Sequence, residues 1–144
     1  MTDYKIPSLT VDAIMEENGK ILMIRRKSKT YNDFLALPGG YVDYGESVEN
    51  AVKREVLEEL GLTATPLDIL GVYSQPKRDP RGHVISIVFV CSFSGDINAG
   101  DDAKSFEWLS MQDLDKEKLA FDHSQILKHY MNWKIEKGTY WSSK

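Results

Sequence analysis

The distribution of apolar positions along the chain predicts a series of short extended segments. Residues 9–16 and 20–26 form two such runs, and Asn18-Gly19 between them favours a tight hairpin turn. A nearly continuous apolar run, rich in β-branched residues, covers 84–93 and is typical of a central strand that is covered on both faces. Shorter extended runs lie at 34–38, 68–74 and 105–109.

Two longer stretches without glycine or proline predict helices. Residues 47–60 have Ser47 in position to cap the first turn, and Gly61 stands where a helix-ending glycine belongs. Residues 122–136 begin with Asp122, a good N-cap. Strands on both sides of a central helix, followed by a second helix, predict an α/β fold: an α/β/α sandwich around a mixed β-sheet. We expect the tail after Gly138 to be loosely held.

The length and the charge exclude several classes of protein. The chain has 144 residues, the size of one domain, and 18 Lys and Arg face 22 Asp and Glu, for a net charge of −4. That balance argues against non-specific binding to nucleic acid, and no apolar run is long enough for a membrane helix. Residues 1–8 lack the apolar region of a signal peptide. Cys91 is the single cysteine, which we expect in the core. We therefore expect a cytoplasmic protein with no membrane or nucleic-acid partner.

The predicted first helix carries three carboxylates on one stripe. Glu55, Glu58 and Glu59 have i, i+3, i+4 spacing, which places them within an arc of roughly 100°. Their charges repel each other, and near the helix C-terminus they also oppose the helix dipole. A Mg²⁺ ion would remove this cost, because it prefers carboxylate oxygens together with substrate phosphates. A solvated acidic face is the simpler interpretation of the three glutamates alone.

The residues around the stripe favour a metal site. Gly39 and Gly40 precede the helix in a loop where bare backbone can approach a metal or a phosphate. Arg54 lies beside the acids and can pair with Glu46 or with a neighbouring glutamate, which would fix the carboxylates in orientation. An acidic stripe, a glycine loop and an orienting arginine together indicate a site for phosphate chemistry.

The same segment carries a family resemblance. Residues 40–62 read GYVDYGESVENAVKREVLEELGL and resemble the Nudix box, G-x5-E-x7-R-E-U-x-E-E-x-G-U, where U is a bulky aliphatic residue. All nine defined positions match: Gly40, Glu46, Arg54, Glu55, Val56, Glu58, Glu59, Gly61 and Leu62. The order of the predicted strands also resembles this family, so the resemblance implies one Nudix domain over residues 1–144 with a Nudix-type fold.

The resemblance implies hydrolysis of a pyrophosphate with Mg²⁺ or Mn²⁺. Glu55 and Glu59 would bind the metal, and Glu58 would be a third ligand or would hold the attacking water. The backbone carbonyl of Gly39 would complete the metal site, while Glu46 and Arg54 would orient the acids. In some relatives the catalytic base comes from a later loop, where Asp101 and Asp102 are the candidates here. The sequence does not choose between Glu58 and these aspartates.

Two features resemble the ADP-ribose pyrophosphatase branch of the family. Pro76 lies fifteen positions after Gly61, and residues 78–83 resemble a loop of small ADP-ribose-cleaving members. Arg78 and Arg81 of that loop could clamp a diphosphate or a ribose. Other candidates for substrate contacts are Arg25 and Arg26, which could bind phosphate, and Phe34 or Tyr31, which could stack on adenine. The expected reaction converts ADP-ribose into AMP and ribose 5-phosphate.

Three alternatives remain open. The segment 74–76 begins like the motif of the NADH-cleaving branch, but residues 77–79 break that array. An enzyme for nucleoside triphosphates or another dinucleotide would share every residue of the box. A non-catalytic ADP-ribose sensor is a third possibility, although the box is intact. Many ADP-ribose-cleaving relatives are dimers, so the resemblance also raises a homodimer as an assembly to consider.

Overall fold

The computed structural model describes residues 4–97 and 105–144. No helix in these two ranges is long and apolar enough to cross a membrane. The elements in chain order are β1 (Ser8–Ile14), β2 (Glu16–Glu17), β3 (Lys20–Arg25), β4 (Leu35–Ala36), β5 (Gly39–Tyr41), α1 (Val48–Leu60), β6 (Thr63–Tyr73), β7 (Val84–Ser94), β8 (Ser105–Ser110), the 3₁₀ helix η1 (Met111–Lys116), α2 (His123–Glu136) and β9 (Tyr140–Trp141).

The strands form two sheets. The first has the order β5-β1-β7-β6-β9 and is mixed, because β1 pairs in parallel with β7 and antiparallel with β5. The second joins β2, β3 and β4, and β8 pairs antiparallel with β3. The predicted mixed sheet is confirmed, and β7 is its central strand, as the apolar run 84–93 predicts. The predicted strand 9–16 is divided between the two sheets, since β1 ends at Ile14 and β2 begins at Glu16.

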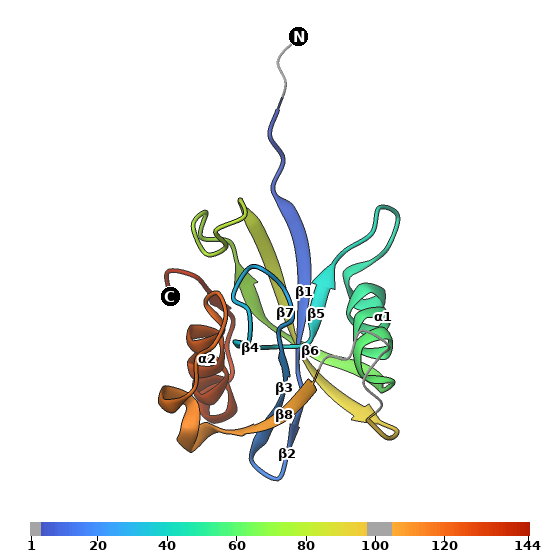
Figure 1. Cartoon of the computed structure of the whole chain (residues 1–144), viewed down its shortest axis with the longest axis vertical. Helices are drawn as coiled ribbons and strands as arrows, with labels where there is room; N and C mark the ends of the chain where they lie inside the picture. The colour runs from blue at the N-terminus through green and yellow to red at the C-terminus, as the bar shows by residue number, and fades with distance from the viewer. Residues whose placement is uncertain (1–3, 98–104) are drawn as a thin grey trace.

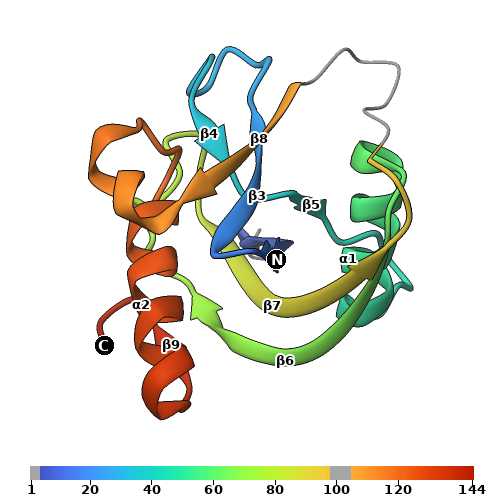
Figure 2. The same cartoon turned by 90° about the horizontal axis from the view of Figure 1, so that it is seen from below.

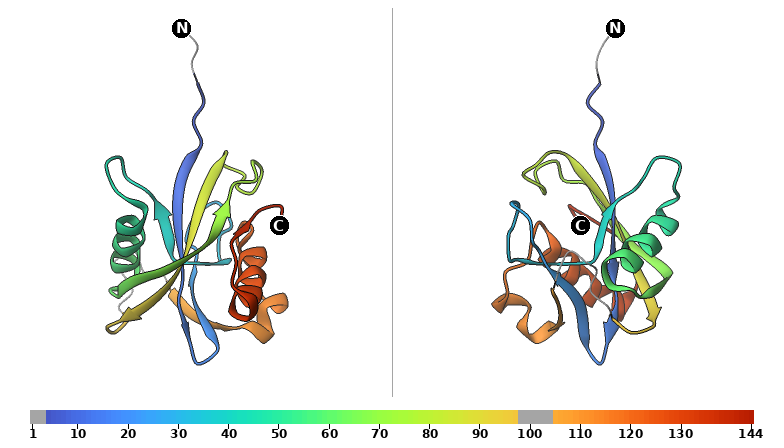
Figure 3. Two further views of the ribbon diagram at one scale, coloured as in Figure 1. Left: turned by 180° about the vertical axis from the view of Figure 1, so that it is seen from behind. Right: turned by 45° about the vertical axis from the view of Figure 1, so that its right-hand side comes forward.

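The two helices lie on opposite sides of the strands (Figure 1). Seen from below, β6 and β7 curve from the side of α1 to the side of α2 (Figure 2). The helices remain on either side in both views of Figure 3. Each helix covers its own hydrophobic core: α1 supplies Ala51 and Val56 to one cluster, and α2 supplies Ile126 and Leu127 to the other. The predicted sandwich is therefore confirmed.

Helix α1 begins and ends where its sequence predicts. The Ser47 hydroxyl accepts the N–H of Asn50 at 3.2 Å, and Gly61 ends the helix with φ = 71°. Its buried side chains, Ala51, Val52, Val56 and Leu60, face the sheet. Glu55, Glu58 and Glu59 are thereby left on the side of the helix that does not pack into the core.

The predicted loose tail is wrong, because its last residues add a strand to the first sheet. Tyr140 lies opposite Gly71 of β6, and its side chain is buried. A Cβ at Gly71 would overlap the Tyr140 carbonyl, so the glycine permits this close pairing. The Ser142 hydroxyl also accepts the backbone N–H groups of Ser74 and Gln75. These contacts join residues about 70 positions apart in the sequence, so the local pattern of residues does not predict them.

Candidate active site

The three glutamates of α1 differ in their surroundings. Gly39 and Gly40, which the sequence predicts in a loop, lie in strand β5, and Oε1 of Glu59 accepts the N–H of Gly39 at 2.9 Å. The Glu55 side chain is largely covered, with 15% exposed, whereas the Glu58 side chain is 59% exposed. The carboxylates of Glu55 and Glu59 thus lie against the two glycines of β5, and that of Glu58 faces outward.

Gly40 explains how Glu55 can approach strand β5. A Cβ at residue 40 would lie 2.5 Å from both carboxylate oxygens of Glu55, well inside contact distance. The absence of a side chain therefore leaves room for this carboxylate beside the backbone. The sequence predicts that bare backbone at Gly39 and Gly40 can come close to the site, and Gly40 does lie close to the Glu55 carboxylate.

Arg54 holds the acidic stripe together. Its Nε and Nη2 donate to the two carboxylate oxygens of Glu46 at 2.7 and 3.0 Å. Its Nη1 donates to Glu55 at 2.9 Å and to Glu58 at 3.2 Å, and Nη2 also reaches the carbonyl of Tyr41. The predicted Arg54–Glu46 pair is confirmed. Through it, one planar guanidinium links the loop before α1 to two of the three candidate metal ligands.

This arrangement changes the protonation equilibria of both partners. The hydrogen bonds that Arg54 donates to Glu46, and then the one that it donates to Glu55, raise the pKa of Arg54 above its usual range. The hydrogen bonds from Arg54 hold the pKa of Glu46 below that of an ordinary glutamate. Both groups stay charged near neutral pH, so the orienting network remains intact there.

The donor set at this site suits a hard divalent ion. Glu55, Glu58 and Glu59 supply carboxylate oxygens, and Gly39 brings backbone close to Glu59. Across the described residues, no three acidic, histidine or cysteine side chains converge enough to hold a metal by themselves. Mg²⁺ commonly binds one or two carboxylates and completes its octahedron with water and substrate phosphate, so the residues fit an ion that binds with its substrate.

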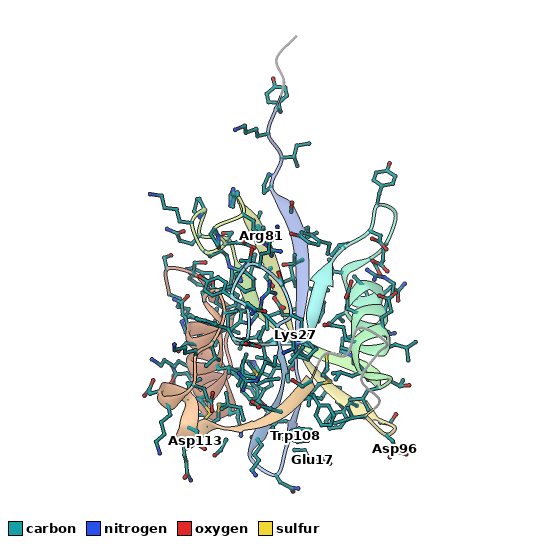
Figure 4. The ribbon with its side chains drawn as sticks, in the orientation of Figure 1. Glu17, Lys27, Arg81, Asp96, Trp108 and Asp113 are labelled. Atoms are coloured by element: carbon teal, nitrogen blue, oxygen red, sulfur yellow. The ribbon has the colours of Figure 1, made fainter. Side chains whose placement is uncertain are left out.

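A small pocket of about 150 Å³ adjoins these acids. Arg26 and Lys27 line it together with Gly39 and Glu59. Figure 4 labels Lys27 just after β3, in the region between the two helices. Arg26 donates to the Thr30 carbonyl and to a serine hydroxyl, and both acceptors are neutral. A pocket lined by Arg26 and Lys27 suits a phosphate.

Arg25, the residue predicted to bind phosphate, points elsewhere. Its guanidinium donates to Glu107 of β8 at 2.6 Å and to the carbonyl of Asp33 at 2.6 Å. Consecutive residues at the end of a strand project to opposite sides, which separates Arg25 from Arg26. Of the two arginines, the structure brings only Arg26 to the acidic stripe. A substrate contact from Arg25 stays a prediction without support from this geometry.

The predicted pair of arginines in the 78–83 loop is split. Arg78 forms a two-point ion pair with Asp122 at 2.6 and 2.9 Å, and only 4% of its side chain is exposed. Burial is the largest single influence and lowers the pKa of Arg78, but the hydrogen bonds and charge of Asp122, together with the charges of Asp12 and Asp79, raise it overall. Arg81 is 41% exposed and is held by Asp79, whose hydrogen bonds raise the pKa of Arg81. Arg81, which Figure 4 labels on the loop between β6 and β7, is the one accessible to a ligand.

Phe34 belongs to an aromatic cluster near the pocket. Its ring meets the edge of Tyr31, and Tyr31 meets Phe121, with ring centroids 5.2 and 5.0 Å apart. The guanidinium carbons of Arg26 and Arg81 lie 4.8 and 5.5 Å from the Phe121 centroid. Phe121 thus links the two accessible arginines. Sequence reasoning missed it, because no local motif marks this residue.

Asp101 and Asp102, the candidates for the base in the later loop, lie outside the described residues. Glu58 is therefore the candidate base whose position is known. Its exposed carboxylate stands one helical turn from Arg54 and adjacent in sequence to Glu59. The choice between Glu58 and Asp102 stays a prediction.

The fold and this site define the class of the protein. A model of the NUDIX domain matches residues 7–130, and the chain belongs to the Nudix family. The match contains the whole motif at 40–62, so the family prediction is confirmed.

Three relatives within or near this family are similar to most of the chain. The chain is 52% identical to an ADP-ribose pyrophosphatase of Methanocaldococcus jannaschii, over 91% of this chain and 77% of the relative. It resembles the NUDIX domain of Shewanella oneidensis NrtR complexed with ADP ribose (25% identity, TM-score 0.81, 92% and 91% coverage). It also resembles a bifunctional NMN adenylyltransferase/ADP ribose pyrophosphatase of Francisella tularensis complexed with AMP and a Mn ion (30% identity, TM-score 0.76). That match covers 95% of this chain and 44% of the larger protein.

Proposed function

We propose that this protein hydrolyses ADP-ribose to AMP and ribose 5-phosphate with the help of Mg²⁺ or Mn²⁺. The observation that carries the proposal is the carboxylate stripe of α1, held by Arg54 and Gly39 beside a pocket that contains Arg26. The ADP-ribose pyrophosphatase with 52% identity supports the choice of substrate, as does the NUDIX domain complexed with ADP ribose.

The residues have distinct roles in this proposal. Glu55 and Glu59 bind the metal together with the carbonyl of Gly39, and Glu58 is a third ligand or takes the proton from the attacking water. A bound divalent ion neutralises phosphate charge and lowers the pKa of a bound water. Arg54 keeps the carboxylates in place throughout.

The substrate contacts follow from exposure and charge. Arg26 binds the pyrophosphate from the pocket, and Arg81 contacts it or the adjoining ribose from the 78–83 loop. Arg78 shapes that loop through Asp122. The adenine contact of Phe34, the homodimer and the cytoplasmic location stay predictions from the sequence.

The test is to incubate the purified protein with ADP-ribose and Mg²⁺ and to follow AMP by chromatography. A Glu59→Gln variant is the control, since it keeps the shape of the side chain and removes the charge. We expect AMP from the wild type and a loss of several orders of magnitude in the variant. A panel of nucleoside triphosphates and dinucleotides, ranked by kcat/KM, tests the alternative substrates. If the wild type binds ADP-ribose tightly but releases no AMP, the protein is an ADP-ribose sensor and not an enzyme.

A further inference from the structure

A buried polar chain lies directly behind the metal-site loop. His123, the first residue of α2, is 3% exposed, and its Nδ1 accepts the backbone N–H of Leu37 at 3.0 Å. Its Nε2 lies 3.9 Å from Oδ2 of Asp12 on β1. The same Asp12 oxygen accepts a hydrogen bond from the hydroxyl of Ser86 on β7. The chain therefore connects α2, two strands of the mixed sheet and the loop that leads to Gly39.

The protonation of the imidazole follows from its surroundings. Burial lowers the pKa of His123, so the ring is neutral near pH 7. Because Nδ1 accepts the Leu37 N–H, it carries no proton, and the single ring proton belongs to Nε2. That N–H faces the Asp12 carboxylate. The hydrogen bond from Leu37 thus fixes the tautomer of the ring, whereas the 3.9 Å contact between Nε2 and Asp12 is electrostatic.

Both ends of the chain reach the metal-site backbone. Leu37 is two residues before Gly39, and Gly39 itself donates to Glu59. Asp12 pairs with Gly39 across β1 and β5, and a Cβ on Gly39 would lie 2.5 Å from Oδ1 of Asp12. Leu37 and Asp12, the two neighbours of the His123 ring, therefore both adjoin the same short backbone segment.

The segment has a second set of ties to the region before α2. Leu35 donates to the carbonyl of Lys118 and accepts the N–H of Ala120, at 3.0 and 2.8 Å. His123 extends this pairing to Leu37, whose N–H is buried and needs an acceptor. Loss of the acceptor would leave that N–H unsatisfied unless the loop shifts.

We propose that His123 is a positioning residue of the metal site, which acts through Leu37 and Asp12 to hold the Gly39 backbone against Glu59. The proposal rests on the function proposed above. Partners that orient metal ligands from behind are worth about 10- to 100-fold in metal affinity in other proteins. His123 touches neither the expected metal nor the expected substrate.

Two amide substitutions separate the two contacts of the ring. In His123→Asn the amide oxygen takes the place of Nδ1 and can still accept the Leu37 N–H. In His123→Gln the longer side chain reaches toward Asp12 and leaves the Leu37 N–H without its acceptor. His129→Gln is the matched control: His129 is also buried in α2, but its Nδ1 meets the hydroxyl of Tyr73, away from the loop.

The measurement is the affinity for Mn²⁺, from the electron paramagnetic resonance signal of the free ion, in the presence of the α,β-methylene analogue of ADP-ribose. Thermal denaturation checks that each variant is folded. We expect His123→Gln to bind Mn²⁺ at least about 10-fold more weakly than the wild type, and His129→Gln to stay within about 3-fold. His123→Asn keeps the Leu37 contact and loses the one with Asp12, so its loss should be smaller than that of His123→Gln and similar to that of Asp12→Asn. Unchanged affinity in a folded His123→Gln, or an equal loss in His129→Gln, would overturn the proposal.

Two further outcomes are distinguishable. If the wild type takes up no Mn²⁺ with the analogue, the proposed function fails, and not merely the role of His123. If His123→Gln does not fold, Asp12→Asn decides, because it keeps an acceptor for Ser86 and removes the charge that faces Nε2. A folded Asp12→Asn is expected to lose Mn²⁺ affinity several-fold, and an unchanged affinity would contradict the role of this chain.

Discussion

Arg54 and Glu46 form a two-point ion pair that ties helix α1 to the loop before it. The two bonds, 2.7 and 3.0 Å long, use one edge of the guanidinium and leave Nη1 for Glu55 and Glu58. The planar fork therefore sets the angle between the loop and the acidic stripe. A lysine could satisfy one of these oxygens but could not fix that angle.

Arg54→Lys is accordingly expected to lower kcat on ADP-ribose about 100-fold, since small misplacements of catalytic groups have effects of that size. The melting temperature should change less than kcat, because lysine keeps a positive charge beside the Glu46 carboxylate. Steady-state kinetics and thermal denaturation measure the two quantities. Lys53→Arg, an exposed neighbour on the same helix, is the control. A wild-type kcat in Arg54→Lys would show that the orientation is set elsewhere.

Gly40→Ala should weaken metal binding without unfolding the protein. The new methyl group would displace the Glu55 carboxylate, which is the end of a flexible side chain. We expect the Mg²⁺ concentration for half-maximal activity to rise about 10-fold. Gly39→Ala differs, because its Cβ would meet the backbone carbonyl of Val11. The free energy of unfolding of that variant, measured by urea denaturation, should fall by about 1–3 kcal/mol. A larger loss of stability in Gly40→Ala than in Gly39→Ala would contradict this geometry.

The two buried histidines of α2 predict a loss of stability in mild acid. Burial lowers the pKa of His123 and of His129 below the ordinary 6.5. As pH falls below that value, the unfolded chain binds protons that the folded chain does not, so the free energy of unfolding decreases. The slope is at most about 1.4 kcal/mol per pH unit for each histidine.

Urea denaturation between pH 7 and 5 measures this dependence, in a range above the titration of most carboxylates. A variant with asparagine at both positions should show a flatter profile. Equal slopes in the wild type and the double variant would mean that neither histidine is responsible.

The C-terminal strand should contribute to stability, contrary to the sequence-based expectation. Tyr140→Ala removes a buried ring and should cost about 3 kcal/mol in the free energy of unfolding. Trp141→Ala should cost less than about 1 kcal/mol, because 48% of that side chain is exposed. Chemical denaturation of both variants gives the comparison. Similar small losses in the two would indicate that the tail is loose after all.

The parts of the molecule that sequence analysis predicted correctly are those with local signals. Helix α1 has its cap at Ser47 and its ending glycine within fourteen residues, and the Arg54–Glu46 pair joins two positions eight apart. The turn at Asn18-Gly19 is likewise local, with both residues at positive φ. The residues that determine these features are close together in the sequence, so a local pattern is enough to predict them.

The parts that it missed depend on distant partners. Arg78 binds Asp122 across 44 residues, which removes it from the open surface. Phe121 meets Arg26 and Arg81, which lie far from it in the sequence. Tyr140 joins the sheet because Gly71 leaves room for it. Neither hydrophobic periodicity nor a local motif in the sequence indicates any of these contacts.

The central claim is that the stripe of Glu55 and Glu59 holds a divalent ion against Gly39 while a pyrophosphate is bound. The most direct test is anomalous diffraction from crystals of the protein grown with Mn²⁺ and the α,β-methylene analogue of ADP-ribose. The account predicts a manganese peak bonded to both carboxylates and to an oxygen of the analogue. Crystals with the analogue bound and no manganese on these glutamates would contradict it.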